Sequence, residues 1–387
     1  MLNRIGATLC IIVSSVNCAH GNIKSSSEHA VQQQSVRFNH AQFLGSHNSY
    51  KKAVHPTVLT LITSHNPKLS RQINYSHIDL DAQLDVGLRH LEIDVLVDDT
   101  GGKYAYPLAE KIAGSRLLDK AERQQLLKPG FKVLHIPDLD ISSHCQLFSE
   151  CLHQLTAWSN RNPEHLPISI LLNVKESHIK FVKGTIPEEF GPAQYQALDR
   201  VIFNAISEQS LFSPDSLRAH YDSLDEAIEQ AGWPLLKDMR GKFIFIFDAN
   251  TKQRELYRDE HFALMGRAMF ASYEPGEPEA AIMIRNNPVE QFSEISSLVD
   301  QGYLIRTRAD ADLSAPTAKN QARFQAAKAS GAQVISTDYY PSSPQAIESG
   351  YQVSFSDDCF VQSNQRLQRE HSSVVCFQSR IAQYTQY

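Results

Sequence analysis

Short apolar runs alternate with helical segments over most of this chain, and this alternation limits the possible folds most strongly. The expected strands lie at the start of 43–50 and within 88–97, 131–135, 168–175, 242–248, 267–271, 302–308 and 333–338. Such alternation predicts right-handed βαβ units and a parallel sheet. About eight strands close a (β/α)₈ barrel. A doubly wound open sheet is the alternative, but no glycine-rich phosphate loop follows the first strand. We predict an α/β barrel in one domain over residues 41–341, with helical insertions.

The two ends of the chain have a different character. Arg4 precedes an apolar run that is too short to span a bilayer and ends in small residues, so we predict a cleaved signal peptide over 1–20. Residues 21–40 are rich in Ser, Gln and His and predict a flexible leader, whereas 342–387 would be a C-terminal extension. These features predict a secreted or periplasmic protein without a transmembrane segment.

Charge and cysteine content narrow the class of protein further. The net charge of −6 gives no nucleic-acid footprint. After removal of the signal, Cys145, Cys151, Cys359 and Cys376 remain, and an even number in an exported chain indicates two disulfides. Of the three possible connectivities, local pairing is favoured: Cys145 with Cys151, and Cys359 with Cys376. The second disulfide would stabilise the C-terminal extension. A zinc site is the alternative, although no CxxC pair is present.

Polar residues occupy the carboxyl ends of the expected strands, where barrels of this type carry their sites. Glu92 and Asp94 are two residues apart on one strand, so both point to the barrel interior. Buried carboxylates need compensation. Ca²⁺, or less favourably Mg²⁺, bound by these two acids and by Asn48 would provide it. A salt bridge to Arg89 or Lys175 is the alternative.

Two histidines stand at the ends of different strands, His47 after the first and His135 after the third. Paired histidines suit cleavage of a phosphodiester, since one accepts the proton of an attacking hydroxyl and the other protonates the leaving alkoxide. Arg308, together with the metal, would stabilise charge on the phosphoryl oxygens. We predict that His47 and His135 are catalytic.

Six segments carry a resemblance to a known family. They are Gly-Ser-His-Asn-Ser-Tyr at 45–50, the run 83–94 that ends in His-Leu-Glu-Ile-Asp, Val-Leu-His-Ile-Pro-Asp at 133–138, Gly-Trp-Pro at 232–234, Arg-Thr-Arg-Ala-Asp-Ala-Asp at 306–312, and 331–339 with Ser-Thr-Asp-Tyr at its end. Together they resemble the secreted calcium-dependent phosphatidylinositol-specific phospholipase C family, within the phospholipase C-like phosphodiesterases. The resemblance covers about residues 43–341.

The resemblance implies an irregular TIM barrel, in which His47 is the general base toward the inositol 2-hydroxyl and His135 the general acid toward the diacylglycerol oxygen. It implies metal ligands at Asn48, Glu92 and Asp94. Calcium-independent relatives have an arginine at the position of Asp94, so this carboxylate implies dependence on the ion. An acid usually follows the strand over 168–175; Asn173 stands there instead and contributes no charge. Substrate binding is assigned to Lys175, Arg308, Asp338 and Tyr339.

The expected protein is therefore a metal-dependent phospholipase C that yields diacylglycerol and an inositol (cyclic) phosphate. It would act as a monomer on phospholipid at a membrane surface. A glycerophosphodiester phosphodiesterase with soluble substrates is one alternative. A catalytically silent barrel that binds lipid or sugar is the other.

Overall fold

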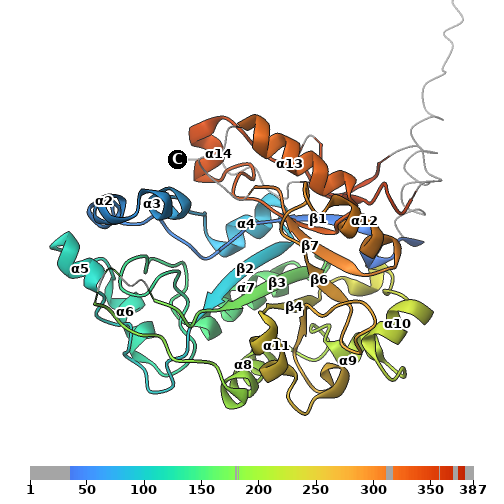
Figure 1. Cartoon of the computed structure of the whole chain (residues 1–387), viewed down its shortest axis with the longest axis horizontal. Coiled ribbons are helices and arrows are strands. Elements are labelled where there is room, and N and C mark those ends of the chain that lie inside the picture. Colours follow the sequence, from blue (N-terminus) through green and yellow to red (C-terminus); the bar gives the residue numbers. More distant parts are fainter. Residues whose placement is uncertain are drawn as a thin grey trace, which may run out of the picture.

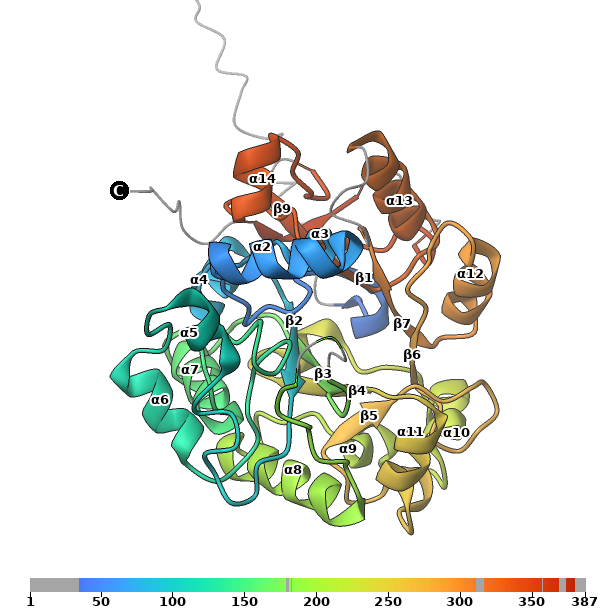
Figure 2. The same cartoon turned by 60° about the vertical axis from the view of Figure 1, so that its left-hand side comes forward.

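The computed structural model describes residues 35–178, 181, 183–310, 317–356, 358–368 and 374–379. Eight parallel strands form a nearly closed barrel in the order β5-β4-β3-β2-β1-β8-β7-β6 (Figures 1 and 2). A single parallel bridge between Ser272 and Ile282 joins the two ends. The barrel strands are β1 (Ala41–Gly45), β2 (His90–Val95), β3 (Ile168–Val174), β4 (Phe243–Asp248), β5 (Met269–Ala271), β6 (Ile282–Ile284), β7 (Leu304–Arg308) and β8 (Val334–Ser336). The predicted α/β barrel is confirmed.

Helices surround the barrel, and α3 reaches its mouth (Figure 2). The α-helices are α2 (Pro56–His65), α3 (Pro67–Ile73), α4 (Leu80–Val86), α5 (Leu108–Ala113), α6 (Lys120–Leu127), α7 (Phe148–Arg161), α8 (Pro192–Ala205), α9 (Pro214–Arg218), α10 (Leu224–Gln230), α11 (Thr251–Arg258), α12 (Phe292–Asp300), α13 (Thr317–Ala329) and α14 (Pro344–Ser349). The short 3₁₀ helices are η1 (Phe38–His40), η2 (Leu236–Met239) and η3 (Phe262–Leu264).

The strand sequences show why the barrel forms. Apolar side chains in β3 and β4 point to both faces, and nearly all are buried, as expected where helices cover the outside and side chains fill the inside. In β4 the run Phe-Ile-Phe-Ile-Phe is fully apolar, and only the terminal Asp248 is half-buried. The parallel strands therefore all end on the same side of the barrel, where Asp248 stands at the end of β4.

One predicted strand is wrong, and one real strand was missed. Residues 131–135 form no barrel strand. They lie in the long connection between β2 and β3, where Lys132 makes isolated antiparallel bridges with Leu96 and Leu147. Strand β6 has only three residues, which is too short for a periodicity signal. The two errors offset each other, so the expected number of strands was right for a partly wrong reason.

The irregular part of the barrel lies at β1. Only Gly45 of β1 pairs with β2, opposite His90, and the beginning of β1 pairs with the antiparallel strand β9 (Cys359–Ser363). A Cβ on Gly45 would lie 2.3 Å from both Cβ and the carbonyl oxygen of His90, so only glycine allows this approach. The strand end that carries the first site residues is therefore held directly against β2.

Residues 36–40 differ from the expected leader. Val36 and Phe38 are buried, and their backbones bond to Leu236 and Pro234. The leader prediction does not hold for these residues, because their apolar side chains pack into the base of the barrel. The predicted signal peptide lies outside the described residues. Within the described part of the chain, no helix is both long and apolar enough to cross a bilayer.

Both disulfides have the favoured local pairing. Cys145 is bonded to Cys151 at the start of α7, and Cys359 is bonded to Cys376. The second disulfide joins β9 to β10 (Cys376–Ser379), which also pair as strands. All four sulfurs are therefore committed to disulfides, which leaves no thiolate for the zinc alternative.

Candidate active site

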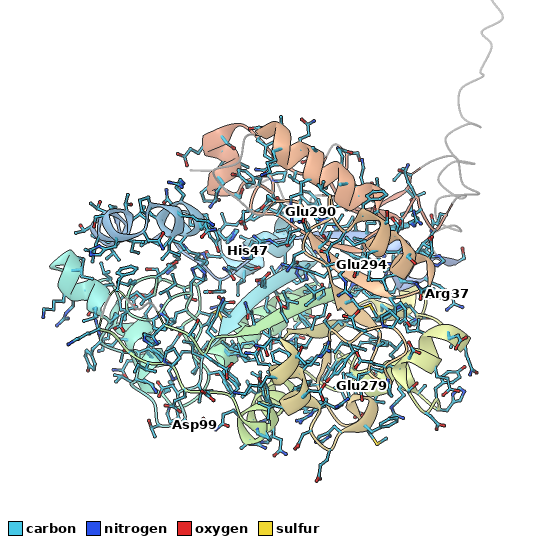
Figure 3. All side chains as sticks on the ribbon, viewed as in Figure 1. Arg37, His47, Asp99, Glu279, Glu290 and Glu294 are labelled. Carbon is cyan, nitrogen blue, oxygen red and sulfur yellow. A yellow bond between two sulfur atoms is a disulfide. The ribbon has the colours of Figure 1, made fainter. Side chains whose placement is uncertain are left out.

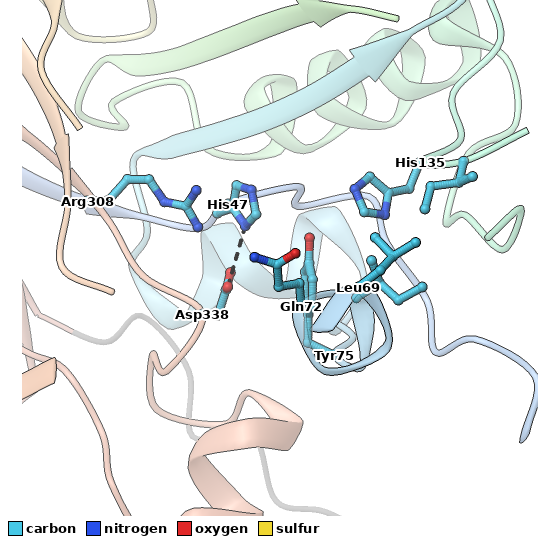
Figure 4. A pocket seen from close by; sticks show the side chains of 9 residues that line it. His47, Leu69, Gln72, Tyr75, His135, Arg308 and Asp338 are labelled. Atoms are coloured by element: carbon cyan, nitrogen blue, oxygen red, sulfur yellow. Dashed lines mark hydrogen bonds and ion pairs between the residues drawn. The ribbon is translucent and has the colours of Figure 1, made fainter. Parts of the chain in front are cut away.

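A pocket of about 230 Å³ lies at the carboxyl ends of the strands, where the barrel opens (Figure 4). It is lined by residues in or just after β1, α3, β7 and β8, and by residues of the connection between β2 and β3. Its lining consists of His47, Leu69, Gln72, Ile73, Tyr75, His135, Ile136, Arg308 and Asp338. Two histidines and one arginine from distant parts of the chain thus share a single cavity.

His47 is held from both sides of its ring. It follows β1 in a turn, and Figure 3 shows it near the middle of the view. Its Nδ1 lies 3.4 Å from Oδ2 of Asp338, and its Nε2 lies 3.8 Å from Oε1 of Glu92. Burial, reinforced by the positive charge of Arg308, holds the pKa of His47 well below its usual value. His47 is therefore neutral near pH 7, as a proton acceptor must be.

A second, buried histidine fixes the backbone of His47. Nε2 of His77 donates to the carbonyl oxygen of His47 over 2.7 Å. Its Nδ1 then accepts from the hydroxyl of Tyr340, 3.2 Å away. Burial lowers the pKa of His77 to about 4, so the ring is neutral and this tautomer satisfies both nitrogens. His77 was not among the predicted site residues, and it supports His47 from behind the pocket.

His135 has a different environment. Its Nδ1 lies 2.8 Å from Oδ2 of Asp140, a carboxylate with no exposed surface. The ammonium of Lys51, also fully buried, lies 3.3 Å from the same oxygen and donates to the carbonyl of Tyr75. The ring of Tyr75 stands between the two histidines, 5.7 Å from His47 and 6.5 Å from His135 between ring centres. Asp140 thus orients the ring of His135.

We expect the Asp140→Asn substitution to reduce turnover of phosphodiester substrate by roughly ten- to a hundredfold. The amide keeps the shape of the side chain but removes the carboxylate oxygen that orients Nδ1 of His135. Thermal unfolding serves as the control, because Lys51 also loses its counter-charge. A folded variant with an unchanged rate would contradict the assignment.

The interior acids carry internal ion pairs. Oε2 of Glu92 lies 2.5 Å from Nη2 of Arg306, and Oδ2 of Asp94 lies 3.0 Å from the ammonium of Lys175. The hydroxyl of Tyr50 also donates to Oδ2 of Asp94, over 2.8 Å. The salt-bridge alternative is therefore present at both acids. Lys175, one of the two predicted partners, is paired with Asp94, whereas Glu92 is paired with Arg306.

Arg89, the other partner considered in the sequence analysis, is not available to Glu92. Its guanidinium donates to the carbonyls of Leu84 and Leu88 and lies over the ring of Trp158, 5.2 Å from the ring centre. It belongs to the packing between α4 and α7, outside the barrel.

The remaining predicted ligand stands beside the acids. In the strand register, Asn173 pairs with Asp94 on one side and with Asp248 on the other. The three side chains therefore form one layer at the mouth of the barrel. Burial raises the pKa of Asp248, and the charge of Glu92 raises it further, although Arg306 opposes both. Asp248 supplies the layer with an acid, while Asn173 contributes no charge.

The donor atoms of this layer suit a hard cation. Oδ1 of Asn48 and Oδ1 of Asp94 are both buried and have no hydrogen-bond partner among the described residues. Buried oxygens without partners are costly, and oxygen atoms of amides and carboxylates are the ligands that Ca²⁺ prefers. Among the described residues, no three His, Cys, Asp or Glu side chains are already arranged around a metal position. The oxygens fit the ion in chemical type, whereas the two acids are neutralised by Arg306 and Lys175.

The four residues assigned to substrate binding have different positions. Arg308 lines the pocket, and Asp338 lines it while also contacting His47. Lys175 does not line this pocket and pairs with Asp94 instead. Tyr339 is buried against Tyr351, with ring centres 5.3 Å apart. The structure does not bring Tyr339 into the pocket, because its ring packs into an apolar cluster that includes Phe324 of α13.

Three further residues near the site were not predicted from the sequence. Arg306 is two residues before Arg308, so strand alternation could have placed it on the inner face. Asp140 and Lys51 gave no comparable signal, because their contacts with His135 and Tyr75 arise from an irregular loop.

Two histidines beside an arginine at the mouth of a parallel barrel define a class of protein: a barrel enzyme that acts on phosphodiesters. The sequence model described as "Phosphoinositide phospholipase C, Ca2+-dependent" matches residues 36–365. This chain belongs to that family.

One solved structure supports the fold, and a second is reported beside it as similar. A Ca²⁺-dependent phosphatidylinositol-specific phospholipase C from Streptomyces antibioticus is similar with a TM-score of 0.52 and 19% identity, over 79% of this chain and 96% of that one. A calcium-dependent phosphoinositol-specific phospholipase C from Pseudomonas sp. aligns over 79% and 92% of the two chains, with 14% identity and a TM-score of 0.47. No curated protein matches this chain.

Proposed function

We propose that this protein is a Ca²⁺-dependent phospholipase C that cleaves phosphatidylinositol at the bond between phosphorus and the glycerol oxygen. The observation that carries the proposal is the convergence of His47 and His135 on one pocket that also contains Arg308. Family membership supports the substrate class. Two disulfides support export to an oxidising compartment, secreted or periplasmic.

The proposed reaction is an internal transfer of the phosphoryl group. Nε2 of neutral His47 takes the proton of the inositol 2-hydroxyl, while Nδ1 is oriented by Asp338. The inositol oxygen forms a bond to phosphorus, and the bond from phosphorus to the glycerol oxygen breaks. Protonated His135, held by Asp140, gives its proton to that leaving oxygen. Diacylglycerol and an inositol cyclic phosphate result.

Charge on the phosphoryl oxygens requires cations nearby, and Arg308 is the pocket residue with that role. Asn48, Glu92, Asp94 and Asn173 are the residues that would hold Ca²⁺, with Asp248 beside them. When bound, the ion would supply further positive charge to the phosphoryl group.

A substrate panel with and without calcium tests the proposal. We expect release of water-soluble inositol phosphate from phosphatidylinositol in Ca²⁺, loss of at least a hundredfold in EDTA, and recovery on return of the ion. Glycerophosphoinositol should not be turned over. Cleavage of glycerophosphoinositol alone would favour the soluble-substrate alternative. Absence of turnover of both would favour a silent binding barrel, and activity indifferent to EDTA would remove calcium from the proposal.

A further inference from the structure

Lys175 occupies an unusual place for a substrate-binding lysine. Its ammonium lies 3.0 Å from Oδ2 of Asp94, and its side chain is only 23% exposed. Asp94 itself is fully buried, and Tyr50 donates to the same oxygen. The lysine therefore neutralises an acid inside the barrel rather than facing the pocket.

The other carboxylate oxygen of Asp94 has no partner in the part of the chain that the structure describes. There Oδ1 is buried without a hydrogen bond, and so is Oδ1 of Asn48, whose amide nitrogen donates to the hydroxyl of Tyr75 over 2.6 Å. One side of Asp94 is thus satisfied by an internal cation, while the other side carries the unpartnered lone pairs that a metal ion would use.

The net charge around Asp94 favours only weak binding of one further cation. Glu92, Asp94 and Asp248 contribute three negative charges when ionised, against two positive charges from Arg306 and Lys175. Asn173, next to both Asp94 and Asp248 in the strand register, adds none. A divalent ion bound to Asp94 would stand close to the ammonium of Lys175, and like charges repel strongly where water is scarce.

We propose that Lys175 and Ca²⁺ are alternative counter-ions of Asp94. Without metal, the ammonium compensates the buried carboxylate and keeps the mouth of the barrel stable. When Ca²⁺ binds, the ion compensates the charge of Asp94 in place of the lysine. The ammonium repels the ion, so Lys175 weakens calcium binding. The inference rests on the calcium site of the proposed function.

The test compares wild type with Lys175→Met, which keeps the length of the aliphatic stem and removes the charge. Calcium affinity is measured by titration calorimetry on the metal-free chain, and thermal unfolding is followed in EDTA and in saturating Ca²⁺. We expect the variant to bind Ca²⁺ about tenfold more tightly or better, because affinity follows the charge of the ligand set. Its Tm should fall below wild type in EDTA and recover in Ca²⁺.

Lys252→Met is the matched control, since Lys252 is 72% exposed and pairs with the exposed Glu189. It should leave both the affinity and the Tm unchanged. Equal calcium affinity in wild type and Lys175→Met, or an equal loss of Tm with and without calcium, would overturn the inference and leave the calcium site intact. No calcium binding by either chain would overturn the site as well. Cleavage of phosphatidylinositol, assayed separately, decides the proposed activity.

Discussion

Replacement of His47 or His135 by alanine should lower the turnover of phosphatidylinositol by at least about a hundredfold for each residue. Each imidazole handles one proton of the proposed transfer, and no neighbouring group can replace it. Asp338, beside His47, already accepts from that ring, and Asp140, beside His135, is fully buried and holds the second ring. Steady-state assays on phosphatidylinositol in Ca²⁺ measure the effect.

The effects of the two substitutions should not be additive. If both histidines serve one concerted transfer, the double variant should lose little more than the worse single variant. His153→Ala is the control, because His153 is an exposed residue on the outer helix α7 and should keep full activity. A double variant that retains wild-type turnover would refute the two-histidine mechanism. Binding of phosphatidylinositol vesicles separates a loss of chemistry from a loss of substrate.

Replacement of Arg306 by methionine should destabilise the metal-free protein by about 3–5 kcal/mol. Arg306 is fully buried in the barrel, where it pairs with Glu92 and donates to Ser336 over 2.9 Å. Methionine leaves the charge of Glu92 uncompensated in a poorly solvated interior. For a chain of this size the loss corresponds to a Tm lower by roughly 4–7 °C in EDTA.

The double variant Arg306→Met with Glu92→Gln provides the control. Removal of both charges should restore much of the stability, since the cost of Arg306→Met comes mainly from the unpaired acid. If the double variant is no more stable than Arg306→Met alone, the ion pair is not the source of the loss. The packing of the arginine stem would then account for it.

The fold was predictable from the sequence to a large extent. The runs over 168–175 and 242–248 are long, apolar and bounded by breakers, and both are barrel strands as β3 and β4. The prediction failed where the signal was short or ambiguous. A run of five residues tipped by His135 has the composition of a strand, yet it lies in a loop tied by isolated bridges. The three residues of β6 are held by their neighbours rather than by their own pattern.

The candidate site was predictable only in part. His47, Glu92 and Asp94 could be placed because they stand at strand ends or alternate along a strand. Tyr339 follows directly after Asp338 and so was also expected at the site, but its ring packs in an apolar cluster that includes Phe324 of α13. Side-chain direction outside a regular strand depends on packing, which the local pattern does not contain.

The sequence by itself determined the type of barrel and the residues that stand at its mouth, because hydrophobic period and strand ends are local properties of the chain. Only the tertiary structure decided which charges meet. Arg306 on β7 reaches Glu92 on β2, and Lys175 after β3 reaches Asp94 on β2. These pairs depend on strand register and barrel closure, which bring together residues far apart in sequence. Because of these contacts, the acids of β2 are paired with basic side chains inside the barrel, which the sequence alone does not show.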